Sequence, residues 1–216
     1  ADFEAALAMT ASPSINHVYA DKDGNIAHYY NAMMPKRPEG AEFSAIDWRG
    51  VIPGDQSNLI WQDYYPFERM PQTVNPPSGL VYNANNTPFR SSVGAGQPKP
   101  QDYAKSMGIQ TNMTNRALRI EALFGPDEAI SRKALHAYKY DNRYARGSVV
   151  DQTIKDLLAM SFEPGSEQKK GQNILKNWKL STDASNTAAA LGVLTTTPFV
   201  LADMREQPAP DVSETF

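Results

Sequence analysis

The stretch Val81–Phe89, written VYNANNTPF, places three asparagines within four positions, at Asn83, Asn85 and Asn86. Asparagine is uncommon in strands and frequent in turns, where its side chain hydrogen-bonds to nearby backbone groups. A carboxamide can also donate two hydrogen bonds without carrying charge, which suits the negative oxygen that develops when a carbonyl is attacked. The residue types alone therefore leave two hypotheses open: a scaffold for an awkward loop, or a catalytic amide.

Other patterns that carry chemistry are weaker. The sequence contains no GxSxG, GxGxxG or Walker pattern, which argues against an elbow-type serine hydrolase and against nucleotide binding. His17, His28 and His136 lack the spacing of a paired-histidine zinc site, and we interpret the first two as ordinary strand residues. The segment Asp21–Asn25 invites a calcium interpretation, but it lacks a further acid or amide before its glycine and a glutamate at the twelfth position, so we interpret it as a hairpin turn.

The totals restrict the class of protein. A chain of 216 residues suits one large domain or two small ones, and 41% apolar with 21% charged residues is typical of a globular protein. A net charge of −3 gives no basic footprint for nucleic acid, and the longest apolar stretches are too short for a membrane span. The absence of cysteine excludes disulfides, a thiolate nucleophile and Cys-ligated zinc.

The elements that would position the asparagines lie in the first half of the chain. Residues 2–11 predict a helix, and residues 14–31 predict a β-hairpin around the Asp23-Gly24 turn. Residues 35–100 hold ten of the sixteen prolines and several aromatic residues, so we expect an ordered, irregular surface that covers something. Within it we expect one short strand near Gly79–Asn83.

The second half predicts helices, and we divide the chain into a sheet-forming part with long Pro/Gly-rich loops, residues 1–100, and a helical subregion, residues 101–216. The apolar spacing and the acidic or proline starts predict five helices. They span residues 114–124, 126–140, 149–158, 167–178 and 183–194, the last continuing to Met204 with an interruption at Pro198.

Three segments match one family in order and with consistent spacing. They are Tyr19–Ile26 (YADKDGNI), Trp48–Pro53 (WRGVIP) and Asn75–Asn86 (NPPSGLVYNANN), and a weaker match is Asn115-Arg116 at the head of a helix. With these segments the chain resembles the penicillin acylase (penicillin amidase) family of N-terminal nucleophile hydrolases, which also includes cephalosporin and acyl-homoserine-lactone acylases.

The resemblance implies an α+β fold: a fragment of the αββα sandwich of N-terminal nucleophile hydrolases, with hairpin strands followed by a helical subregion. It implies hydrolysis of acyl amides through an acyl-enzyme on an N-terminal serine. It also implies roles for three residues, with Asn85 as oxyanion donor, Arg116 as organiser of the site and Ile15 as a wall of the acyl pocket. The rival hypothesis is a non-catalytic module that binds a ligand or partner through its aromatic-rich loops.

The family nucleophile is the first residue of its mature subunit, because its free α-amino group acts as the base. This sequence begins with Ala1, at a helix that the family places inside its β subunit, and it has Ala27 where the family usually has glycine. We therefore expect a piece of a longer, autoproteolytically processed β subunit that is inactive alone. Its expected partners are the missing α subunit, the missing N-terminal part of the β subunit and a small acyl amide, with no nucleic acid or membrane.

The same resemblance implies a periplasmic or secreted protein. We expect no cofactor, with calcium left open for the full protein. Antibiotic metabolism and quorum quenching are the roles that correspond to the penicillin-type and lactone-type members, and the sequence does not distinguish these acyl groups.

Overall fold

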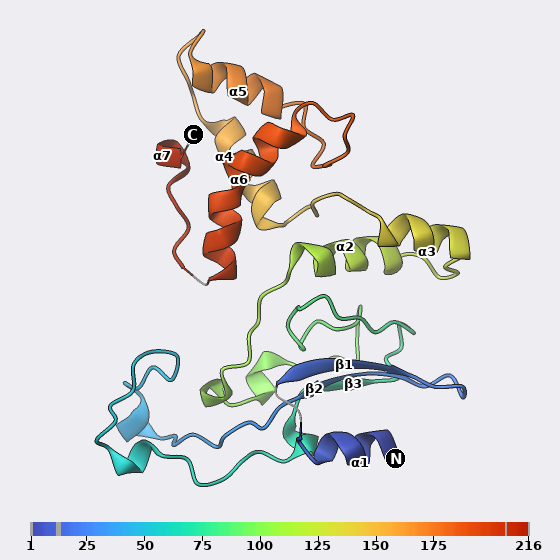
Figure 1. Ribbon diagram of the computed structural model, residues 1–216, viewed down its shortest axis with the longest axis vertical. Coiled ribbons are helices and arrows are strands. Elements are labelled where there is room, and N and C mark those ends of the chain that lie inside the picture. Colours follow the sequence, from blue (N-terminus) through green and yellow to red (C-terminus); the bar gives the residue numbers. More distant parts are fainter. Residues whose placement is uncertain (1, 12–13, 206, 216) are drawn as a thin grey trace. The chain divides into compact units, whose positions relative to one another are not determined.

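The computed structural model describes residues 2–11, 14–205 and 207–215. The chain divides into two compact units, Ala1–Met113 and Thr114–Phe216 (Figure 1). The sheet belongs to the first unit, and helices α2 to α7 belong to the second. Within the described residues, no helix combines the length and the apolar composition that crossing a bilayer requires.

The first unit is built on a small antiparallel sheet. Its elements are α1 (Asp2–Ala8), β1 (Ile15–Ala20), β2 (Ile26–Asn31) and β3 (Gln72–Val74). The strand order is β1-β2-β3, and the register pairs His28 with Val18 on one side and with Thr73 on the other. The hairpin predicted over residues 14–31 is therefore confirmed.

The hairpin turn is stabilised by the carboxylate of Asp21. Its Oδ1 accepts hydrogen bonds from the backbone N–H groups of Asp23 and Asn25, both at 2.9 Å, and its Oδ2 accepts one from Asn25 Nδ2 at 2.8 Å. These hydrogen bonds, that of the Asn25 side chain first, lower the pKa of Asp21. Gly24 has a φ of 87°, a left-handed conformation that glycine adopts without strain. The carboxylate thus serves the turn, as the sequence interpretation held.

The two faces of the sheet have different partners, because successive side chains on a strand point to opposite sides. On one face α1 packs through Leu7 against Ala27, Tyr29 and Phe67. The Tyr29 hydroxyl donates to Glu4 Oε1 at 2.9 Å, and burial together with this bond raises the pKa of Tyr29 to about 12. The other face carries His28, Thr73 and Tyr30. Asn16, which is paired with Tyr30, lies on this face and contacts the asparagine segment.

The prediction of a short strand over Gly79–Asn83 is wrong, and the third strand is β3 instead. Inside that range the N–H of Leu80 donates to the Ser78 hydroxyl and the N–H of Tyr82 donates to the carbonyl of Ser91, so neither is available for a strand of the sheet. The rest of the proline-rich region is irregular, as predicted, with short 3-10 turns at Ala41–Phe43, Ser57–Leu59 and Phe67–Arg69. Two more such turns, Pro100–Asp102 and Lys105–Met107, follow at its end and just beyond it.

The second unit is helical. Its helices are α2 (Asn115–Phe124), α3 (Arg132–Lys139), α4 (Val149–Ala159), α5 (Glu167–Leu175), α6 (Ala189–Met204) and α7 (Val212–Thr215). Helix α3 begins six residues later than predicted, because the Ser131 hydroxyl accepts from Ala134 N and caps the helix there. Helix α6 also begins late, and it continues through Pro198 to Met204.

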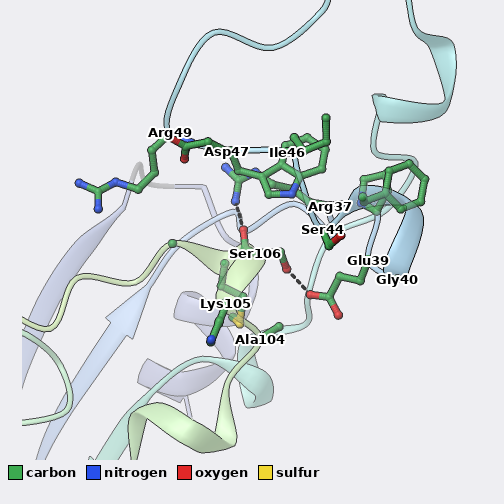
Figure 2. Close-up of a pocket in the computed structure, with 15 residues that line it drawn as sticks. Arg37, Glu39, Gly40, Ser44, Ile46, Asp47, Arg49, Ala104, Lys105 and Ser106 are labelled. Carbon is green, nitrogen blue, oxygen red and sulfur yellow. Dashed lines mark hydrogen bonds between the residues drawn. The ribbon is translucent and has the colours of Figure 1, made fainter.

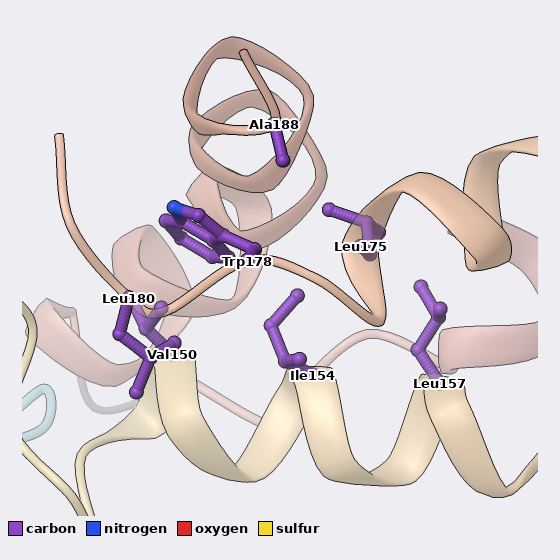
Figure 3. Close-up of a cluster of buried hydrophobic side chains, with 7 residues drawn as sticks. All are labelled: Val150, Ile154, Leu157, Leu175, Trp178, Leu180 and Ala188. Carbon is purple, nitrogen blue, oxygen red and sulfur yellow. The ribbon is translucent and has the colours of Figure 1, made fainter. Parts of the chain in front are cut away.

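The core of the second unit lies between α4, α5 and the start of α6 (Figure 3). Its buried members are Val150, Ile154, Leu157, Leu175, Trp178, Leu180 and Ala188. The Trp178 indole N–H donates to the carbonyl of Ser181 at 2.9 Å, so its polar atom is satisfied although the ring is buried. Gly192 of α6 lies against this ring, and an added Cβ would be 2.4 Å from Trp178 Cε3.

Candidate active site

The three asparagines of the VYNANNTPF segment do different work. Asn83 Oδ1 accepts the backbone N–H of Asn85 at 3.0 Å. Asn86 Oδ1 accepts the N–H of Ala84 at 2.8 Å, and Asn86 Nδ2 donates to the carbonyls of Thr87 (3.1 Å) and Arg90 (2.5 Å). Asn83 and Asn86 therefore scaffold the loop, in the manner typical of asparagine in turns.

Asn85 differs from both. Its φ is 58°, in the left-handed region that costs an ordinary residue about 1 kcal/mol and that asparagine tolerates better than most. The residue is exposed, whereas Asn86 retains only 3% of its accessible surface. Asn83 and Asn86 accept backbone N–H groups inside the turn, and Asn85 is the exposed one of the three asparagines.

A pocket of about 470 Å³ lies beside the loop, and Asn85 and Ile15 both line it. Most of its lining is polar, with the carboxamides of Asn16, Asn83, Asn85, Asn86 and Gln110 among it. Ile15, at the start of β1, is 48% exposed and is the aliphatic residue among those that line the pocket. The structure thus brings two of the three sequence-predicted site residues to one pocket, while the roles assigned to them stay predictions.

Two further pocket residues were not predicted from the sequence. Asn16 on β1 donates through Nδ2 to Asn83 Oδ1 at 3.2 Å, and the Tyr30 hydroxyl accepts from Ser14 Oγ at 2.9 Å. The available signal was the period of the strand: Asn16 and Tyr30 are paired across β1 and β2, so they share a face. That signal becomes useful only once the face toward the asparagine loop is known.

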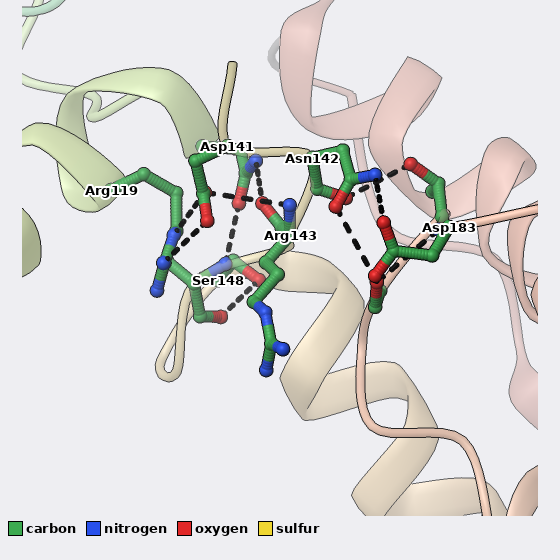
Figure 4. Close-up of polar contacts among 10 residues, drawn as sticks. Arg119, Asp141, Asn142, Arg143, Ser148 and Asp183 are labelled. Atoms are coloured by element: carbon green, nitrogen blue, oxygen red, sulfur yellow. Dashed lines mark hydrogen bonds and ion pairs between the residues drawn. The ribbon is translucent and has the colours of Figure 1, made fainter. Parts of the chain in front are cut away.

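Arg116, the third predicted site residue, lies exposed in the first turn of α2 in the second unit. The helix begins there because Thr114 Oγ1 accepts the N–H of Ala117. Residues on either side of Arg116 fix this end of the helix. Asn115 Oδ1 accepts from Ala145 N at 2.7 Å. Arg119 makes a bidentate ion pair with Asp141 at 2.7 and 2.9 Å (Figure 4).

A second, larger hollow of about 660 Å³ lies in the first unit, beside the segment WRGVIP (Figure 2). Charged side chains near residue 40 bind residue 106, which comes much later in the sequence. Arg37 Nη1 donates to the carbonyl of Ser106 at 2.5 Å and its guanidinium carbon is 6.0 Å from the centre of the Trp48 ring, while the Ser106 hydroxyl donates to Glu39. These contacts hold the irregular loop in place, which is a structural use of the polar residues.

The histidines of the hairpin occupy a different kind of environment. His28 has no accessible surface, and neither ring nitrogen has a hydrogen-bond partner within the described residues. Burial, followed by the nearby His17, lowers the pKa of His28 to about 4, so the ring is neutral near pH 7. In the described part of the chain, no three histidine, aspartate or glutamate side chains come close enough together to hold a metal ion.

Comparison with known proteins gives a consistent result. A family model described as penicillin amidase matches residues 1–206. Penicillin G acylase of Escherichia coli is 37% identical over 75 residues, which are 35% of this chain and 8% of that protein. Penicillin acylase 2 proenzyme of Pseudomonas sp. (strain SE83) is 37% identical over 71 residues, 33% of this chain and 8% of that protein.

Among solved structures, a thermostable penicillin G acylase from Alcaligenes faecalis superposes with a TM-score of 0.62 at 21% identity, over 95% of this chain and 34% of that one. This likeness confirms the predicted α+β fold. The match to each curated relative covers less than a tenth of that relative's length. Because the family model matches nearly the whole sequence, the chain belongs to the penicillin amidase family.

Proposed function

We propose that this chain is part of an amidohydrolase that cleaves acyl amides of the penicillin, cephalosporin or acyl-homoserine-lactone type, and that Asn85 supplies an oxyanion donor. The observation that carries the proposal is that the three asparagines of the loop differ in contacts, conformation and exposure. Asn83 and Asn86 close the turn, while Asn85 is exposed in a left-handed conformation at a pocket that it shares with Ile15. Family membership supports the same chemistry.

In the proposed reaction, a serine at the start of another part of the protein attacks the amide carbonyl, with its own α-amino group taking the proton. The carbonyl oxygen becomes negative, and Asn85 Nδ2 donates to it without introducing a charge. The carbon–nitrogen bond then breaks, the amine leaves with a proton, and water hydrolyses the acyl-serine. These steps use a hydroxyl, an amine and amide donors, so they require no cofactor.

The other proposed roles come from the family resemblance. Ile15 offers an exposed apolar surface in a mainly polar pocket, which suits the hydrocarbon part of an acyl group. Arg116 is proposed to organise the surroundings of the nucleophile, and it stands on a helix end held by Asn115 and Arg119. We propose that the chain works together with the remainder of a β subunit and an α subunit, after autoproteolytic processing, in the periplasm or outside the cell.

The test is Asn85→Ala in the complete enzyme, with turnover of a chromogenic acyl p-nitroanilide as the measurement. We expect kcat to fall about 100-fold, or about 3 kcal/mol of barrier, with KM changed much less, because the bond forms mainly in the transition state. A variant whose kcat stays within twofold of the parent would overturn the proposed role.

Asn75→Ala is the matched control. Asn75 also has a positive φ, 44°; its side-chain oxygen accepts the N–H of Ile26 at 2.9 Å, and its Nδ2 donates to Asn25 Oδ1 at 3.0 Å. It lies outside the pocket that Asn85 and Ile15 share. We expect this variant to lose stability while keeping kcat, which separates loss of a turn asparagine from loss of an oxyanion donor.

The alternative, a non-catalytic binding module, draws on the exposed aromatic side chains of the irregular loop. Trp61 and Tyr64 are 43% and 44% exposed, and the indole N–H of Trp61 donates to the Tyr64 hydroxyl at 3.4 Å. Such a pair suits a ligand or partner surface. If the complete protein shows no amide hydrolysis but binds a partner that Trp61→Ala weakens, this alternative replaces the enzymatic one.

A further inference from the structure

One oxygen atom joins the asparagine loop to the sheet. Asn83 Oδ1 accepts two hydrogen bonds, from the backbone N–H of Asn85 at 3.0 Å and from Asn16 Nδ2 at 3.2 Å. Asn16 and Asn83 are 67 positions apart in the sequence. Asn16 follows Ile15 on β1, so the strand that carries the apolar wall of the pocket also carries the anchor of the loop.

The first of these bonds selects the backbone conformation of Asn85. A side-chain oxygen that accepts the N–H two residues later forms an Asx turn, a local alternative to regular structure. Here the acceptor is Asn83 and the donor is Asn85, whose φ of 58° lies outside the regions that non-glycine residues prefer. Without the bond, the chain is free to relax toward an ordinary φ, and that rotation would redirect the Cα–Cβ bond of Asn85.

The second bond fixes where the turn lies. Asn16 Oδ1 is buried and has no hydrogen-bond partner within the described residues, so among those residues the carboxamide of Asn16 bonds through Nδ2 to Asn83 alone. A buried acceptor without a donor reduces stability, and an apolar side chain of similar shape would avoid that loss. Stability therefore does not explain an asparagine at this position, whereas anchoring Asn83 does.

Asn86 provides the contrast. It is almost fully buried, and its amide bonds to Ala84, Thr87 and Arg90 inside its own loop. None of these contacts reaches Asn85 or the sheet, so Asn86 maintains the loop as a whole.

We propose that Asn83, anchored by Asn16, is a positioning residue that holds the carboxamide of Asn85 in the orientation required for oxyanion stabilisation. The inference rests on the proposed function and adds two residues to it. Asn83 and Asn16 act through Asn85 rather than on the substrate. Their effect should therefore appear in kcat much more than in KM, because a misplaced donor loses transition-state stabilisation before it loses ground-state binding.

The test is a double-mutant cycle in the complete enzyme, with Asn83→Ala, Asn85→Ala and the double variant assayed on the acyl p-nitroanilide. We expect Asn83→Ala to lower kcat about tenfold or more with KM within about twofold. In the Asn85→Ala background the same change should alter kcat by less than about twofold, because nothing remains to be positioned. Asn83→Ser keeps an acceptor for the Asn85 N–H and should recover part of the loss.

Two outcomes overturn the inference while leaving the function intact. One is wild-type kcat in Asn83→Ala. The other is an equal loss in both backgrounds, which would mean that Asn83 acts independently of Asn85. If Asn85→Ala itself keeps wild-type kcat, the proposed function fails first and takes the inference with it, so the two failures are distinguished by the single variant.

Asn16→Leu makes the test independent of any folding defect in Asn83→Ala. We expect the melting temperature to be unchanged or higher, since a buried unpaired oxygen is removed, and kcat to be several-fold lower, since Asn83 loses its anchor. Wild-type kcat in this variant would overturn the anchoring role of Asn16. A parallel loss of stability and kcat would assign Asn16 to folding and overturn it as well.

Discussion

The complete burial of His28 leads to a prediction of how the stability of the fold depends on pH. The ring lies on β2 with no accessible surface, and neither nitrogen has a hydrogen-bond partner within the described residues. Protonation would bury a charge, so the pKa falls from 6.5 in an exposed histidine to about 4 in the fold. His17, on the neighbouring strand, adds to the effect.

The size and direction of the effect follow from these two pKa values. Between pH 6.5 and pH 4 the unfolded chain binds a proton that the folded chain does not, so the free energy of unfolding decreases as the pH falls through this interval. Above about pH 6.5 the contribution is constant, and below about pH 4 the loss is complete. A pKa difference of this size corresponds to about 3 kcal/mol.

The assay is urea unfolding at a series of pH values for the wild type and for His28→Leu. We expect the wild type to lose about 3 kcal/mol of unfolding free energy across the interval beyond any loss in the variant, because leucine does not titrate. The exposed His136→Gln serves as control and should behave as the wild type. If His28→Leu and the wild type lose stability in parallel, the buried imidazole is not the group responsible and the reasoning fails.

Three further predictions concern the second unit and the chain as a whole. Gly192→Ala should destabilise the protein by about 1–3 kcal/mol in urea unfolding despite alanine's higher helix propensity, because the new methyl would lie 2.4 Å from the Trp178 ring. Asp141→Ala should cost about 1–3 kcal/mol, because it leaves the partly buried guanidinium of Arg119 without its bidentate partner. The 216-residue chain assayed alone should show no turnover of the acyl p-nitroanilide, because the proposed nucleophile lies elsewhere.

Each of these three predictions has a control variant or a result that would contradict it. Gly54→Ala, where an added Cβ meets nothing within 4 Å, should change stability by less than about 0.5 kcal/mol. Glu167→Ala breaks an exposed pair with Lys170 and should cost less than about 0.5 kcal/mol, so equal losses for Glu167 and Asp141 would contradict the burial argument. Robust turnover by the chain alone would show that it contains its own nucleophile.

Short sequence patterns correctly predicted the elements whose formation depends on neighbouring residues. Asp23-Gly24 between two β-forming runs predicted the hairpin, and the apolar spacing after Ser148 predicted α4 almost to its ends. The start of α3 was missed because Asp127 and Glu128 resemble an acidic first turn. In the structure Asp127 Oδ1 instead accepts the N–H of Ala129 in a turn, and Ser131 caps the helix.

The candidate site depended on contacts that no local pattern contains. The residue types at Asn83, Asn85 and Asn86 left a catalytic amide as one of two hypotheses, and the family resemblance selected Asn85. The structure adds that Asn86 Nδ2 already donates to the carbonyls of Thr87 and Arg90, and that Asn83 Oδ1 accepts the N–H of Asn85. The bond from Asn16 to Asn83 spans most of the first unit's sequence, so periodicity and propensity could not reveal it.

Side-chain hydrogen bonds join the tip of the hairpin to the start of the asparagine-rich segment. Asn75 accepts from the backbone of Ile26 and donates to the side chain of Asn25, across 49 and 50 positions of sequence. Evolution cannot easily alter either partner alone, so we expect substitutions at Asn25 and Asn75 to arise together among relatives. Anyone grafting the YADKDGNI motif into another scaffold would have to transplant its distant amide as well, or lose the shape of the tip.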